Sequence, residues 1–280
     1  MGAIQLSVKF GLIGGGIMGE ALLSRLIAKQ IYQPLEILVG EPQQQRRIFL
    51  EQQYGVQVTA DNRVVANAAQ VLLLAVKPQN FTSVAQTLQD VISTIAAEKP
   101  PLVISIMGGV PLSNLEAAFP QLPVIRAMPN TPAIVGAGIT AIALGQHTDE
   151  GNQKTAQQLF AAVGEVVEVP EVLMDGVTGL SGSGPAYVAL MVEALSDGGV
   201  AAGLPRAIAT QLAIQTVRGT AQLLQETGMH PAELKDRTTS PSGTTIAGIA
   251  ELERAGFRSA LIEAVRAAKE RSQELGKEES

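Results

Sequence analysis

Three glycines near the N-terminus have the spacing of a dinucleotide-binding loop. Gly14, Gly16 and Gly19 form G-x-G-x-x-G between a β-branched run and a helical pattern. The first glycine permits a tight turn, the second lets the backbone approach a pyrophosphate, and the third lets helix and strand pack closely. Ile17 and Met18 lie at the helix N-terminus, where free N–H groups favour an anion. An ordinary strand–helix turn also uses glycine, but this context predicts a dinucleotide cofactor.

Acidic and basic side chains after the second predicted strand favour different forms of the cofactor's ribose. Glu41 follows the second predicted strand, roughly twenty residues past the loop, where an acidic side chain would bind the ribose 2′-OH of NAD. Arg46 and Arg47 come shortly afterwards and would instead bind the 2′-phosphate of NADP. Glu41 repels such a phosphate unless it turns away, so these residues leave both cofactors open. The polar and charged residues at positions 43–47 could also simply be the solvent-exposed start of a helix.

Further candidates follow other predicted strands. A central strand ends in four expected cofactor contacts: Ala75, Val76, Lys77 and Pro78. The carboxyl edge of a parallel sheet is where such folds hold ligands. Because Lys77 precedes Pro78, we expect it to line the cofactor site through its backbone rather than to act as an acid or base. We expect Arg126 to form a structural ion pair, with anion binding as the alternative, and Asn130 to lie beside the nicotinamide.

These candidates must be positioned by elements that alternate strand and helix over residues 1–170. The predicted strands are Val8–Ile13, Ile37–Val39, Val71–Val76, Leu102–Ile106, Val124–Ala127, Gly138–Leu144 and Val166–Val169. Helical spacing covers Met18–Ala28, Gln43–Gln53, Phe81–Ile92 and Glu150–Val163. Several strands are apolar almost throughout, as strands buried on both faces are. The alternation predicts an α/β Rossmann domain with a mostly parallel, doubly wound sheet.

Only helical patterns follow, which predicts a second, all-α domain over residues 171–280. The expected helices are Pro185–Asp197, Pro205–Glu226, Ile246–Arg254 and Arg258–Leu275. Gly203, Gly228 and Gly256 stand where helices should end. The Pro205–Glu226 helix has apolar residues on more than one face. We therefore expect it to be buried on several sides, which favours an oligomer.

Composition narrows the possible functions. The chain has 280 residues, a net charge of −6 and no long Lys/Arg block, so a nucleic-acid surface is not expected. No apolar run reaches the roughly 18–20 residues of a membrane span, and no secretion signal is recognisable. The absence of cysteine excludes disulfides and thiolate catalysis in this chain and fits the cytoplasmic location that we expect. No metal-ligand spacing occurs among histidines and acidic residues, so no metal is expected.

Five further segments, taken with the glycine loop, resemble pyrroline-5-carboxylate reductases over essentially the whole chain. They are the segments 75–78, 105–109, 126–132, 179–187 and 234–246. The most specific is Lys-Asp…Ser-Pro-x-Gly-Thr-Thr-Ile in the last segment, and Arg-Ala-Met-Pro-Asn-Thr-Pro in the third is almost as specific. The resemblance implies reduction of a five-membered cyclic imine to L-proline, with hydride from NADPH or, as the alternative, NADH. It also implies that Asn62 lies near the cofactor, although a turn or helix cap would explain this residue as well.

The resemblance assigns the substrate carboxylate to the loop that precedes the expected helix at Ile246. The matching residues are Ser240, Gly243, Thr244 and Thr245, of which Thr245 reaches the ring nitrogen and is the expected catalytic residue. A plain N-cap loop would also select Ser and Thr here. The family pattern has glycine where this chain has Ser242, which leaves the conformation of the loop open at that residue.

The resemblance further implies a homodimer through the C-terminal helices, and it leaves open whether dimers assemble further into a decamer. Each active site would then combine the cofactor domain of one subunit with the partner's 240–245 loop. Two rival functions remain: another imine or 3-hydroxyacid reductase of this architecture, and a non-catalytic NAD(P)-binding regulator. A serine-hydrolase elbow is not expected, because Ser183 breaks the last position of G-x-S-x-G.

Overall fold

The computed structural model describes residues 8–95 and 100–278. The chain forms two compact units. The sheet unit comprises the described residues of Met1–Gly182 and Ala268–Ser280, and the helical unit comprises Ser183–Ala267. The domain boundary expected after residue 170 stays a prediction. The last strand ends close to it, but the sheet unit also takes in 171–182 and the end of the last helix.

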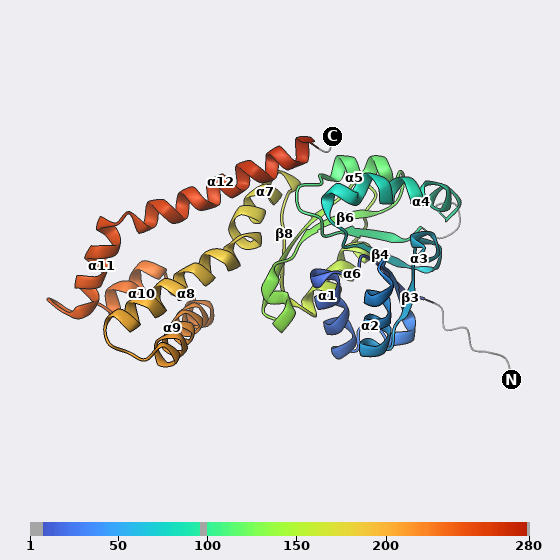
Figure 1. Ribbon diagram of the computed structural model, residues 1–280. Helices are drawn as coiled ribbons and strands as arrows, with labels where there is room; N and C mark the ends of the chain where they lie inside the picture. The colour runs from blue at the N-terminus through green and yellow to red at the C-terminus, as the bar shows by residue number, and fades with distance from the viewer. Residues whose placement is uncertain (1–7, 96–99, 279–280) are drawn as a thin grey trace. The chain divides into compact units, whose positions relative to one another are not determined.

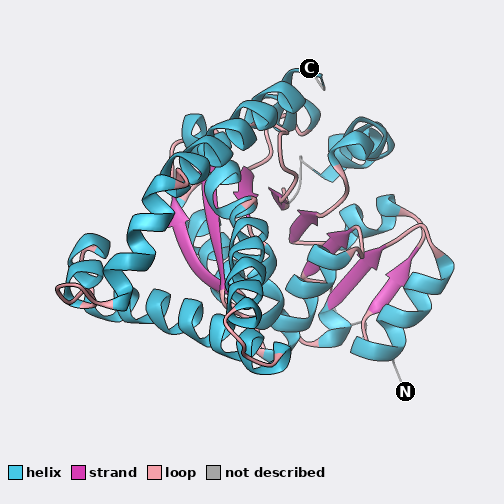
Figure 2. Ribbon diagram, turned by 60° about the vertical axis from the view of Figure 1, so that its left-hand side comes forward, coloured by secondary structure: helices cyan, strands magenta, loops and turns pink. Residues whose placement is uncertain are grey.

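The sheet unit is built on eight strands that run in the order β3-β2-β1-β4-β5-β6-β7-β8. Figure 2 shows strands of this sheet in magenta. Their bounds are β1 Phe10–Ile13, β2 Ile37–Gly40, β3 Gln57–Thr59, β4 Val71–Leu74, β5 Leu102–Ser105, β6 Val124–Met128, β7 Gly138–Leu144 and β8 Gly164–Glu168. All neighbouring pairs are parallel except β6 and β7. The predicted mostly parallel sheet is therefore confirmed. The strand that the sequence did not predict, β3, is short, lies at the edge and is not fully buried.

Helices cover both faces of this sheet, with α1 and α2 on one side and α4 and α5 on the other (Figure 1). Their bounds are α1 Ile17–Ala28, α2 Gln44–Tyr54, α3 Asn62–Ala68, α4 Phe81–Ile95, α5 Leu112–Ala118, α6 Glu150–Ala161 and α7 Met174–Val177. Two apolar cores result, one beneath α1, α2 and α6 and the other beneath α3, α4 and α5. Leu12 packs into the first core and Ile13 into the second, since successive strand residues point to opposite faces.

Short helical segments complete the sheet unit. They are the 3₁₀ helices η1 Pro34–Glu36, η2 Pro78–Asn80, η3 Thr131–Val135 and η4 Glu171–Leu173, and the π-helix η5 Thr178–Gly182. Segments η4, α7 and η5 follow one another and lead from the sheet toward the helical unit. The connection is therefore helical throughout.

The helical unit contains α8 Gly184–Ala201, α9 Arg206–Thr227, α10 Pro231–Arg237, α11 Thr244–Arg254 and the first part of α12 Phe257–Glu278. The expected all-α region is confirmed. Glycines end these helices as predicted: Gly228 caps α9 in the left-handed conformation. His230 caps α10, its Nδ1 accepting a hydrogen bond from the Ala232 N–H at 3.2 Å, so it has a structural role.

The helical unit has little interior of its own. Within α8, α9, α10 and α11 the buried residues are small: Ser196, Ala209 and Ala213. Large apolar side chains remain exposed on several helices, among them Leu190, Leu212, Ile246 and Ile262. Such a surface is typical of a protein–protein interface. Among the described residues, no helix is both long and apolar enough to cross a membrane.

Candidate functional site

The glycine loop has the geometry that a dinucleotide requires. Gly14 has a φ of 103°, and a Cβ there would lie 2.7 Å from the carbonyl oxygen of Ala75, so only glycine fits. Gly16 precedes α1; no side chain caps this helix, and a Cβ on Gly16 would meet no atom within 4 Å. Free N–H groups at the start of α1 are thus open to an anion, and the residues present fit the pyrophosphate of a dinucleotide.

Side chains from the β2–α2 region hold both backbone groups of Gly15. Glu41 accepts a hydrogen bond from the Gly15 N–H through Oε2 at 3.0 Å, and from the Gln43 N–H through Oε1 at 2.9 Å. Arg46 donates from Nε to the Gly15 carbonyl oxygen at 2.6 Å. The residues that sequence analysis assigned to the ribose therefore lie against the phosphate loop.

A second layer of contacts supports this arrangement. Arg46 also pairs with Glu20 of α1, and the Tyr54 hydroxyl donates to the other Glu20 oxygen at 2.7 Å. Burial and the hydrogen bond to Glu20 raise the pKa of Tyr54 to about 12. Burial alone would raise the pKa of Glu20, but the hydrogen bonds from Tyr54 and Arg46 outweigh it and lower that pKa. Sequence analysis missed Glu20 and Tyr54, because nothing local indicates that they meet.

Other predicted cofactor residues lie close to this loop. Ile17 is exposed at the start of α1, and Met18 is partly buried against the first core. Asn62 is the first residue of α3, and its Oδ1 lies beside Gly40, at the end of β2. Asp61, not Asn62, caps α3. The polar end of Asn62 is therefore not used as a helix cap.

The segment after β4 also adjoins the loop. The Ala75 N–H donates to the Ile13 carbonyl at 2.8 Å, which ties the end of β4 to the end of β1. Val76 and Pro78 are half-buried, whereas Lys77 is exposed and precedes η2. The loop, the end of β2 and the end of β4 thus form one edge of the sheet. The cofactor contacts assigned to these residues stay predictions.

Asn130, after β6, uses its side chain within the protein. Its Oδ1 accepts from the Ile139 N–H at 3.0 Å, and its Nδ2 donates to the Ser181 carbonyl at 3.2 Å. The amide therefore joins η5 to the start of β7, and the side chain is buried. Its predicted position beside the nicotinamide is untested.

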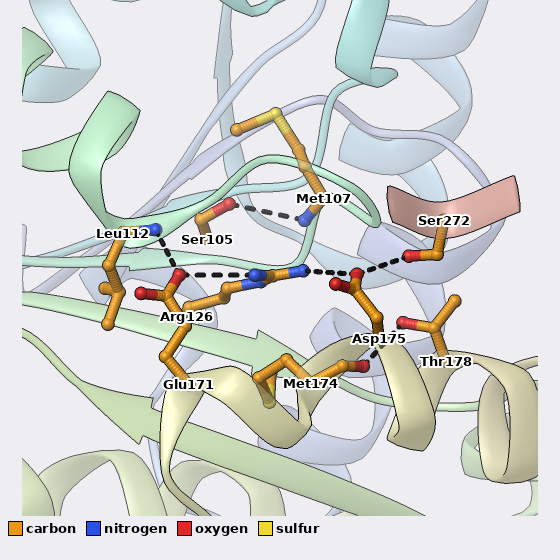
Figure 3. Close-up of polar contacts among 9 residues, drawn as sticks. All are labelled: Ser105, Met107, Leu112, Arg126, Glu171, Met174, Asp175, Thr178 and Ser272. Atoms are coloured by element: carbon orange, nitrogen blue, oxygen red, sulfur yellow. Dashed lines mark hydrogen bonds and ion pairs between the residues drawn. The ribbon is translucent and has the colours of Figure 1, made fainter. Parts of the chain in front are cut away.

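Arg126 is the buried centre of a partly buried ion-pair cluster (Figure 3). The guanidinium lies 3.2 Å from Glu171 of η4 and 3.8 Å from Asp175 of α7, and its side chain is 5% exposed. Ser272 of α12 donates to Asp175 at 2.7 Å, and the Leu112 N–H donates to Glu171. The structure confirms the expected structural role of Arg126, which joins β6 to η4 and α7 and, through Asp175, to the end of α12.

Residues 240–243 form a tight turn before α11, and Thr244 and Thr245 are the first two residues of that helix. The Gly243 N–H donates to the Ser240 carbonyl at 3.1 Å, and a Cβ on Gly243 would lie 2.3 Å from the Ser240 Oγ. Pro241 and Ser242 are the central residues of this turn. Ser242 has a φ of 55°, so it adopts the left-handed conformation that glycine would adopt more easily. The loop thus keeps its turn despite the departure from the family pattern.

Thr245 is half-buried and lines a cavity of about 580 Å³ in the helical unit. Residues of α9 and α10 line most of the rest, including Thr216, Thr220 and Lys235, and Thr238 follows α10. Ser240 and Thr244 are exposed. The substrate roles of the loop remain predictions. Among the described residues there is no cluster of three or more His, Cys, Asp or Glu side chains that could hold a metal.

Comparisons with known proteins place these features in a family. Residues 9–109 match the family described as NADP oxidoreductase coenzyme F420-dependent, and residues 171–275 match pyrroline-5-carboxylate reductase dimerisation. The chain is 59% identical over 273 residues to the pyrroline-5-carboxylate reductase of Synechocystis sp., covering 97% of this chain and 100% of that protein. The chain belongs to the pyrroline-5-carboxylate reductase family.

Other relatives agree. The pyrroline-5-carboxylate reductase of Methanosarcina acetivorans is 47% identical, with coverage of 96% of this chain and 98% of that protein. A solved reductase from Coxiella burnetii is 36% identical with a TM-score of 0.87, covering 96% and 98% of the two chains. One from Plasmodium falciparum, with NADP bound, is 30% identical with a TM-score of 0.86 and coverage of 97% and 99%. The resemblance found in the sequence is confirmed, and the protein is an oxidoreductase of an NAD(P)-dependent family.

Proposed function

We propose that this protein reduces 1-pyrroline-5-carboxylate to L-proline, the last step of proline biosynthesis. The observation that carries the proposal is the 59% identity to a pyrroline-5-carboxylate reductase over nearly the whole chain. The open N-terminus of α1 and the turn before α11 support it, because the reaction needs a dinucleotide site and a carboxylate site.

In the proposed reaction, the protein mainly holds the cofactor and the imine in position. A reduced nicotinamide held at this site would supply the hydride for the imine carbon, and the ring nitrogen would end with a proton. Because a cyclic iminium is already electrophilic, holding the two reactants in register supplies much of the rate. The residues proposed to hold the cofactor are Gly14, Gly16, Ile17, Met18, Gly19, Glu41, Arg46, Asn62, Ala75, Val76, Lys77, Pro78 and Asn130.

The loop before α11 is proposed to hold the substrate. Backbone N–H groups from Thr244 onward in the first turn of α11, with the Ser240 hydroxyl, bind the carboxylate beside Gly243. Thr245 then directs its hydroxyl at the ring nitrogen and is the proposed catalytic residue. Its position on the wall of a cavity in the helical unit supports this role.

NADPH is the proposed reductant, with NADH as the alternative. The relative with NADP bound supports NADPH, whereas Glu41 after β2 favours the unphosphorylated ribose. Affinity measurements with both cofactors distinguish the two.

A homodimer through the C-terminal helices is the proposed assembly. The family match over 171–275 and the exposed apolar side chains of α8 and α9 support it. A decamer assembled from dimers is a further part of the proposal, as are active sites that draw on two subunits. Light scattering on the purified chain measures the assembly. The cysteine-free composition fits the proposed cytoplasmic location, which cell fractionation tests.

Steady-state oxidation of NADPH or NADH with pyrroline-5-carboxylate tests the activity. We expect turnover that requires the imine and yields proline, with no turnover when a 3-hydroxyacid and the oxidised cofactor are supplied instead. Turnover of the hydroxyacid alone would contradict the proposed substrate. Tight cofactor binding without turnover on either substrate would indicate a regulator.

A further inference from the structure

A chain of three side chains links α2, through α1, to the phosphate loop. The Tyr54 hydroxyl of α2 donates to Glu20 Oε1 of α1 at 2.7 Å, and the other Glu20 oxygen pairs with Arg46 of α2. Arg46 in turn donates from Nε to the carbonyl oxygen of Gly15 at 2.6 Å. Because α1 and α2 lie side by side, Glu20 meets partners that are 26 and 34 residues further along the chain (Figure 1).

The Arg46 guanidinium is also held by an aromatic ring. It lies over Phe49, with 5.0 Å between Cζ and the ring centroid. The Phe49 ring meets that of Tyr54 edge-on, with 6.4 Å between the centroids. A cation is attracted to an aromatic face, and the N–H groups of a planar guanidinium have fixed relative directions. The side chain of Arg46 therefore holds the Gly15 carbonyl in one direction.

The direction of the Gly15 carbonyl sets the direction of the next N–H group. In a trans peptide, the C=O and the following N–H point in opposite directions, and no peptide bond among the described residues is cis. The Gly16 N–H therefore points away from Arg46. Gly15 is buried and Gly16 is exposed, and none of the hydrogen bonds between described residues uses the Gly16 N–H. This donor is thus oriented in advance and open to a ligand.

We propose that Arg46, Glu20 and Tyr54 are positioning residues of the dinucleotide site, which fix the Gly15–Gly16 peptide so that the Gly16 N–H meets the pyrophosphate. A donor that is already oriented strengthens binding, because the ligand does not have to order it. Arg46 thus serves the part that NADH and NADPH share, and not the 2′-phosphate. The inference rests on the dinucleotide site of the proposed function and is independent of its imine substrate.

The test measures dissociation constants of NADH and NADPH, by nucleotide fluorescence and calorimetry, for the full-length protein and two variants. Arg46→Lys keeps the charge but loses the planar fork, and Tyr54→Phe removes only the hydroxyl that holds Glu20. We expect Arg46→Lys to weaken both cofactors equally, by about fivefold or more, and Tyr54→Phe to weaken both by about threefold. Weakening of NADPH alone in Arg46→Lys overturns the inference, because it indicates contact with the 2′-phosphate.

Ligand fragments separate positioning from a general loss of structure. ADP carries a diphosphate and adenosine does not, so Arg46→Lys should weaken ADP by the same factor as the cofactors and leave adenosine unchanged. Equal weakening of ADP and adenosine would overturn the inference. A lower thermal midpoint with unchanged affinity for ADP would also overturn it, because the three residues would then only stabilise the fold.

Tyr32→Phe is the matched control, because it removes a tyrosine hydroxyl at the opposite end of β1, where the Tyr32 ring stacks on Phe10. Its cofactor affinities should equal those of the wild type; a loss equal to that of Tyr54→Phe would contradict a role for the position of Tyr54. These affinities need no turnover, so a failed positioning test is distinguishable from a failed activity assay. Absence of binding by the unaltered protein would overturn the dinucleotide site and this inference with it.

Discussion

The carbonyl oxygen of Gly14 lies 2.3 Å from the place that a Cβ on Gly19 would occupy. The first turn of α1 therefore rests directly on the loop that it follows. By contrast, a Cβ on Gly16 would point into open space. The three glycines of one motif thus meet different constraints, and two variants can separate them.

Gly19→Ala should lower the free energy of unfolding by about 2 kcal/mol, because the backbone has to move. Gly16→Ala should change it by less than about 0.5 kcal/mol, yet weaken both NADH and NADPH about tenfold or more by filling the space beside the pyrophosphate. Chemical denaturation and cofactor titration measure the two effects. Unchanged affinity in Gly16→Ala would contradict the proposed cofactor position.

Arg126→Met should be among the most destabilising single changes, at about 3 kcal/mol, because it leaves Glu171 and Asp175 without their cation. Arg126→Lys should recover part of this loss, since lysine keeps the charge without the planar fork. The control is Arg63→Met, which breaks the exposed pair with Asp61 and should cost less than about 1 kcal/mol. Equal losses in the two methionine variants would contradict the structural role of Arg126.

Ser242→Val should lower kcat/KM for the imine about tenfold, because a β-branched residue is disfavoured at positive φ and the turn forms less often. Ser242→Gly should stay close to wild type. Relief of strain worth about 1 kcal/mol is offset by the greater freedom of glycine in the unfolded chain. Kinetics and thermal midpoints of both variants check this. A fully active valine variant would show that the turn is not needed.

Thr245→Ala should reduce kcat about tenfold or more through loss of the hydroxyl at the ring nitrogen, with cofactor affinity nearly intact. Thr245→Ser keeps a hydroxyl and should restore most of the rate. Single-turnover kinetics and NADPH titration separate the two effects. Loss of NADPH binding in the alanine variant would contradict the assignment of Thr245 to the substrate site.

Stability should decline in acid through Glu20. Its pKa is lowered in the folded protein, so its contribution is present above the unfolded pKa, about 4.3, and is lost as the pH falls through the folded value. Glu20→Gln should cost about 1 kcal/mol near neutral pH, and the difference from wild type should shrink below about pH 4. Denaturation of both proteins across this range measures it. A difference that persists in acid would exclude the charge as its cause.

The sequence by itself determined the elements whose signals are local. Apolar runs such as Val8–Ile13 predicted the buried strands, of which β1 covers Phe10–Ile13, and the glycine spacing predicted the loop before α1. Glycines and prolines marked the ends of the long helices. Short elements were not predicted from the sequence. Among them are β3, α3, α5 and α10, each of which has at most seven residues. They form because neighbours in space stabilise them, not through a strong pattern of their own.

Only the tertiary structure decided how the charged residues are used. The sequence left Glu41 and Arg46 in conflict over the ribose, and the fold resolves their positions by placing Gly15 within reach of both. Arg126 meets Glu171, 45 residues away, and Asn130 meets Ser181, 51 residues away. A side chain's partner depends on which strand ends lie side by side. That order is a property of the whole sheet, so no local pattern reveals it.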